Sequence, residues 1–121
     1  MSNEQVDVEA YVKTADRTAV ILALSKCVGL LNLDGPPEGE AYIYQAEGVS
    51  AVLQPSEDGF LSVWVRGSSA WSSCATLGRY LANELRSIVC CDPGGEFPEV
   101  SPYSNVFLEM SGDGENLVPW G

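Results

Sequence analysis

Two kinds of hydrophobic spacing alternate along this chain, and their order restricts the folds that it can adopt. Between residues 6 and 12, Val and Ala alternate with polar residues and Tyr11, which is typical of a strand with one buried face. From Val20 to Leu31, apolar residues recur at helical spacing, and Asp16 is placed to cap the helix that this pattern predicts. The first predicted unit is therefore a strand followed by an amphipathic helix.

The rest of the chain continues with strand-like and helix-like segments. Four segments have the residue content of strands: 41–46, 49–53, 60–66 and 88–91. A second helix is predicted after a capping residue between Ser68 and Ser73. Segment 92–105 contains three prolines and is predicted to be irregular. Segments 106–110 and 117–120 flank a Gly-Asp-Gly turn and predict a C-terminal hairpin.

This order of elements predicts an α+β domain with two helices on one face of a mostly antiparallel sheet. The ferredoxin-like split βαβ sandwich fits the order, and the C-terminal β-hairpin would extend its sheet. With 121 residues, the chain is predicted to form one α+β domain over residues 1–121. This fold hosts many unrelated functions and does not by itself indicate one.

The chain has no histidine, and it carries 17 acidic residues against 6 basic ones. Without histidine, no Ser-His or Cys-His nucleophile pair and no imidazole metal ligand can form. The formal net charge of -11 repels phosphates and anionic membranes, so we expect neither nucleic acid nor membrane binding. No apolar run approaches the roughly 18 residues of a membrane span. Because the N-terminus is polar and acidic rather than signal-like, a cytoplasmic location is expected.

The four cysteines form neither a zinc pattern nor an evident disulfide framework. No Cys-x-x-Cys spacing is present, and no histidine could complete a zinc site. Cys27 and Cys74 fall on helical apolar stripes, while Cys90 and Cys91 are adjacent in a strand, so all four are predicted to be buried. Cys74 near a helix start could act as a nucleophile, but core placement is favoured. We therefore expect no metal and no other cofactor.

Acidic residues are concentrated in two segments that contain no basic residue. One lies between Cys27 and Val65 and the other runs from Ser87 to the last residue, with six acids in each. If the two segments meet in the fold, they form one strongly negative surface. Such a surface either docks a basic partner or keeps the protein in solution.

Aromatic side chains are the remaining signal. Tyr and Trp exposed beside acids are typical of interface anchors. Tyr42, Tyr44 and Tyr103 fit either the core or such an interface, whereas Trp64 is predicted to pack under a helix.

These observations predict a non-catalytic, acidic protein-binding domain rather than an enzyme. In concrete form, it would be a small inhibitor or immunity-type protein that masks a basic surface of its protein partner. Acid pairs such as Glu38 with Glu40 lie in Pro/Gly loops without the pocket that catalysis needs. The predicted partner-binding residues lie in the acidic loops: Glu38, Glu40, Glu47, Asp92, Glu96, Glu99, Tyr103, Asp113 and Glu115.

Three alternatives stay open. The protein could mimic a nucleic acid and occupy a nucleic-acid-binding groove, which requires carboxylates spaced like phosphates. It could be a homodimeric structural module, so both a monomer and a homodimer are considered. Last, it could be a small enzyme that uses carboxylates or Cys74, which requires a pocket holding a strongly shifted titrating group.

Overall fold

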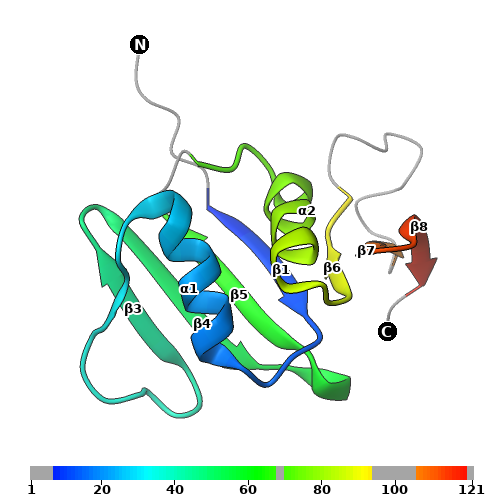
Figure 1. Cartoon of the computed structure of the whole chain (residues 1–121). Coiled ribbons are helices and arrows are strands. Elements are labelled where there is room, and N and C mark those ends of the chain that lie inside the picture. Colours follow the sequence, from blue (N-terminus) through cyan, green and yellow to red (C-terminus); the bar gives the residue numbers. More distant parts are fainter. Residues whose placement is uncertain (1–6, 68–69, 94–105, 120–121) are drawn as a thin grey trace.

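The chain folds into one antiparallel sheet with two helices on one of its faces (Figure 1). The computed structural model describes residues 7–67, 70–93 and 106–119. The helices are α1 (Arg17–Val28) and α2 (Cys74–Leu85), and a short 3-10 turn, η1, spans Glu57–Gly59. The strands are β1 (Val8–Val12), β2 (Asn32–Leu33), β3 (Tyr42–Ala46), β4 (Val49–Pro55), β5 (Leu61–Arg66), β6 (Val89–Cys91), β7 (Val106–Ser111) and β8 (Gly114–Pro119).

The eight strands have the order β2-β3-β4-β5-β1-β6-β7-β8, so β1 lies inside the sheet between β5 and β6. All neighbouring pairs are antiparallel. The predicted α+β class is therefore confirmed, and the C-terminal hairpin extends the sheet beyond β6. Eight strands are more than a ferredoxin-like sandwich contains. The additional strands are the pair β2 and β3, which comes before β4, and the pair β7 and β8, which comes after β6.

Helix α1 begins where the sequence predicts it and ends earlier. The Asp16 side chain caps it by accepting a hydrogen bond from the backbone N–H of Ala19 at 3.0 Å. The helix ends at Gly29, which has a φ of 93°. Leu31 therefore lies after the helix rather than in it, and its side chain is buried. Cys27, predicted to be buried, is exposed. No residue after Leu24 in α1 is buried, and in the last turn Val28 rather than Cys27 packs against the core.

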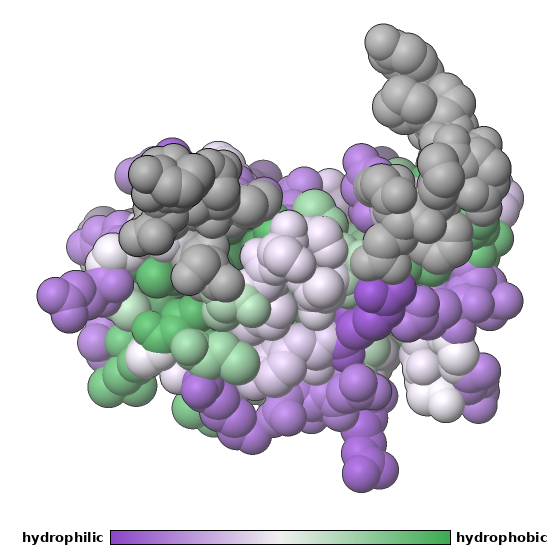
Figure 2. Space-filling view, turned by 90° about the horizontal axis from the view of Figure 1, so that it is seen from above, coloured by the Kyte–Doolittle hydropathy of each residue, from purple (hydrophilic) through white to green (hydrophobic). Residues whose placement is uncertain are grey.

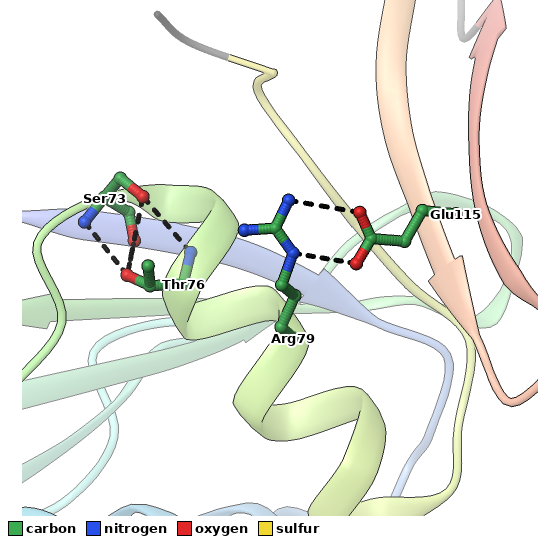
Figure 3. Close-up of polar contacts among 4 residues, drawn as sticks. All are labelled: Ser73, Thr76, Arg79 and Glu115. Atoms are coloured by element: carbon green, nitrogen blue, oxygen red, sulfur yellow. Dashed lines mark hydrogen bonds and ion pairs between the residues drawn. The ribbon is translucent and has the colours of Figure 1, made fainter. Parts of the chain in front are cut away.

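Helix α2 starts at a capping box formed by Ser73 and Thr76 (Figure 3). The Ser73 hydroxyl accepts from the Thr76 N–H at 3.2 Å, and the Thr76 hydroxyl oxygen accepts from the Ser73 N–H at 3.0 Å. This satisfies two donors that a helix start leaves unpaired. The Tyr80 hydroxyl donates to the Ala23 carbonyl at 2.6 Å and so joins α2 to α1.

The face of the sheet opposite the helices carries Trp64, and this overturns the prediction that Trp64 packs under a helix. In β5, Leu61, Val63 and Val65 are the buried residues, and alternation therefore directs Trp64 to the other face. The Trp64 side chain is 37% exposed there, with the Arg66 guanidinium 4.8 Å from its ring centroid. Alternation correctly separates the two faces of β5, but helix placement decides which one is covered.

Candidate functional site

Three of the predicted partner-binding residues lie along the edge of the sheet that β2 and β3 form. Glu38 and Glu40 are in the loop between these strands, and Glu47 is in the turn between β3 and β4. Asp34, directly after β2, is a fourth carboxylate here. It belongs to the first base-free segment but is not among the predicted partner-binding residues. All four side chains are exposed, and we call Asp34, Glu38, Glu40 and Glu47 the acidic edge.

Other members of the predicted set lie in the β6–β8 part of the sheet, on the other side of β1. Asp92 directly follows β6, Asp113 is in the β7–β8 turn, and Glu115 is on β8. Strand β1 lies between β5, the last strand of the first base-free segment, and β6, the first strand of the second. The two segments therefore do not meet in the described part of the sheet (Figure 1). Three predicted residues lie outside the residues that the structure describes: Glu96, Glu99 and Tyr103.

The two edges differ in how their charge is compensated. Arg79 of α2 donates to both carboxylate oxygens of Glu115, with Nε–Oε2 at 2.7 Å and Nη2–Oε1 at 3.1 Å (Figure 3). Such a two-bond pair fixes the carboxylate and balances its charge. On the acidic edge, no carboxylate forms an ion pair with any described basic residue, although the Gln45 amide donates to Asp34 at 3.4 Å. The β2–β3 edge therefore has four exposed carboxylates that no described ion pair balances, whereas at the opposite edge Glu115 is paired and Asp113 is not.

Two strongly exposed leucines adjoin the acidic edge. Leu33 on β2 is 51% exposed, and Leu30, between α1 and β2, is 71% exposed. Because Asn32 pairs with Gln45, the chain before β2 runs toward the end of β3 that leads into the Glu47 turn. Figure 2 views this end of the molecule and shows hydrophobic side chains gathered on the side where α1 and β3 lie in Figure 1. Sequence patterns missed both leucines, because neither belongs to a periodic run.

Burial governs the chemistry of the two strand cysteines. It raises the pKa of the Cys90 thiol to about 11 and that of Cys91 to about 12, so both stay protonated at neutral pH. The prediction that both are buried is confirmed. Cys74, the first residue of α2, is half-buried, and its Sγ accepts a hydrogen bond from the Glu9 N–H at 3.4 Å.

A depression of about 220 Å³ lies between the β1–α1 loop and η1, with Arg17 and Phe60 in its lining. It is smaller than the roughly 300–1,000 Å³ usual for small-molecule sites. The Arg17 guanidinium packs 3.6 Å from the centroid of the Tyr42 ring. Within residues 7–67, 70–93 and 106–119, no group of three or more cysteine or acidic side chains could hold a metal ion.

Both described helices are too short to cross a bilayer, at 12 residues each. Comparisons with known protein families, with curated proteins and with solved structures gave no match to this chain. What the protein binds is therefore inferred from the acidic edge and its surroundings.

Proposed function

We propose that this protein is a non-catalytic, acidic protein-binding domain whose acidic edge docks on a basic surface of a partner protein. The observation that carries the proposal is the uncompensated charge of four exposed carboxylates at one edge of the sheet. Charge of one sign on a surface speeds encounter with a protein of opposite charge. An inhibitor or immunity-type protein that covers a basic site would act in this way.

The acidic edge suits this role better than the opposite edge does. Glu115 already pairs with Arg79, so docking a basic partner there would first require that pair to open. Glu38 and Glu40 lie in a stretch, 32–40, in which every residue is exposed. A partner can therefore approach these carboxylates without displacing another side chain.

Differential capture with charge-matched variants tests the proposal. The tagged protein is incubated with native lysate at low salt, and the proteins that a salt step releases are quantified. The test variant is E38Q/E40Q/E47Q, which removes three charges from the acidic edge. The control is E57Q/D58N/D113N, which changes the net charge equally through exposed residues of η1 and the β7–β8 turn.

We expect the wild-type protein and the control to retain one basic protein stoichiometrically, and the test variant to lose it. The association rate should fall steeply as salt rises, because salt screens exposed charges beyond about 10 Å at 0.1 M. Equal retention by both variants, or equal loss from both, would mean that the acidic edge has no special role.

We further propose that β4, β5, β1 and β6, with the two helices, form a ferredoxin-like split βαβ unit. Support comes from their order in the sheet and from their antiparallel pairing. The hairpins at the two edges are then additions to this unit, and the acidic edge belongs to the first addition.

A further inference from the structure

We infer that Leu30 and Leu33 are the apolar anchors of the acidic edge, and that they insert into an apolar groove on the basic partner protein. The inference rests on the proposed function, because it states how the same surface gains affinity after the charges have guided the encounter. The partner must then present a groove with an apolar floor and basic residues on its rim.

The exposure of the two leucines is not explained by the fold. The core takes other leucines completely, such as Leu24 and Leu53, each with 0% exposure. Single exposed apolar residues are ordinary on protein surfaces. Leu30 and Leu33, however, are within one short segment at one edge, at 71% and 51% exposure. Two leucines this exposed, three residues apart and next to exposed carboxylates, match the apolar anchors and charged rim of a protein interface.

The backbone that carries the leucines is held in place. Leu31, between them, is buried, and its N–H donates to the Ser25 hydroxyl of α1 at 3.1 Å. After Leu33, the Asp34 N–H donates to the Ile43 carbonyl of β3 at 2.8 Å. Because the segment is fixed before binding, little backbone freedom remains to be lost on association.

Charge selects a basic partner over a second copy of this chain. A second copy docking on the leucines would bring its own acidic edge against the first, with Asp34 directly after Leu33 in both. Like charges facing each other oppose such contact. A basic protein gains from the same carboxylates, and an apolar centre with a charged rim is the usual anatomy of an interface.

Binding kinetics with the purified basic protein captured by the wild-type chain test this inference. The variant is L30S/L33S, and the matched control is L117S, which changes a leucine that is 38% exposed on β8 at the opposite edge. Circular dichroism and urea unfolding check that each variant folds. We expect L30S/L33S to weaken the Kd at least about tenfold through faster dissociation, with the association rate unchanged. L117S should bind as the wild type does.

The outcomes separate this inference from the proposed function. If E38Q/E40Q/E47Q slows association but L30S/L33S dissociates like the wild type, the acidic edge stands and the leucine anchors are refuted. If capture yields no stoichiometric basic protein, both proposals fail. Sedimentation at low and high salt provides the last test. A dimer that L30S/L33S abolishes would overturn the inference in favour of contact between two copies.

Discussion

Replacing Gly67 with alanine probes the close approach of two loops beside the acidic edge. Gly67 directly follows β5 and has a φ of 81°, a conformation that side chains with a Cβ rarely adopt. A Cβ placed there would overlap the carbonyl oxygen of Gly48 in the β3–β4 turn and lie 3.5 Å from its carbonyl carbon. Because this obstacle is backbone, it can move only if the whole turn moves, and Glu47 with it.

Gly59 provides the matched control, since it has the same φ of 81° but no atom within 4 Å of a built Cβ. The left-handed conformation costs alanine about 1–2 kcal/mol at either position. Overlap in a packed site adds about 1–3 kcal/mol. We therefore expect G59A to lower the free energy of unfolding by about 1–2 kcal/mol and G67A by about 2–5 kcal/mol.

Urea unfolding at neutral pH measures both values, and an unchanged m-value confirms that the variants unfold from similarly compact states. In a thermal scan, each kcal/mol should lower Tm by about 3–6 °C for a chain of this length. Equal losses in G59A and G67A would refute the reasoning, because only the contact with Gly48 distinguishes the two sites.

Three further predictions concern the helix cap, an ion pair and the buried thiols. Ser73→Ala removes the capping box and should cost about 1 kcal/mol in urea unfolding, and an unchanged value would rule out the cap as a source of stability. A double-mutant cycle on Arg79 and Glu115 should give a coupling of about 0.5–1 kcal/mol that shrinks in 1 M salt, since both side chains are partly exposed; a salt-independent coupling would contradict this. Above pH 9, the ordinary thiol value, unfolded Cys90 and Cys91 release protons that the folded chain still holds, with pKa values of about 11 and 12. Stability should be fully present below pH 9 and fall as the pH rises toward 12, less steeply in C90A/C91A, and equal slopes would refute the burial effect.

Local patterns located the long elements because each makes its own hydrophobic face. The predicted boundaries of β3 and β5 agree with the structure to within one residue at each end. Strand β2 escaped prediction, since Asn32–Leu33 is too short to show any periodicity. It exists because its backbone pairs with β3, which is a long-range condition that no window of sequence contains.

Burial was predicted less well where it depends on the placement of other elements. The alternation in β5 identified two faces, but the covered face depends on where α1 and α2 lie, and Trp64 was assigned to the wrong one. Cys27 lies on an apolar stripe, but in the last turn of α1 the contact with the core is made by Val28 instead. In both cases the periodicity was read correctly, and its tertiary context was missing.

The candidate site was predictable in its charge and not in its geometry. The base-free segments are visible in the sequence, and they include Glu38, Glu40 and Glu47. Their separation from Asp113 follows from the strand order, with β1 inserted between β5 and β6. Strands that are adjacent in a sheet need not be adjacent in the chain. The sequence alone therefore could not show which of the acidic residues lie on which side of the sheet.

The position of β1 inside the sheet also bears on how the chain folds as it is synthesised. Strand β1 is made first, yet Val8 pairs with Val65 and Tyr11 with Cys90, both far along the chain. Pairing over such separations slows folding, because long loops must close before the contacts form. A nascent chain that has not reached β6 leaves one side of β1 unpaired, and an open strand edge invites pairing with other chains. Completion of residues 89–91 is therefore the step of synthesis at which this aggregation-prone edge can close.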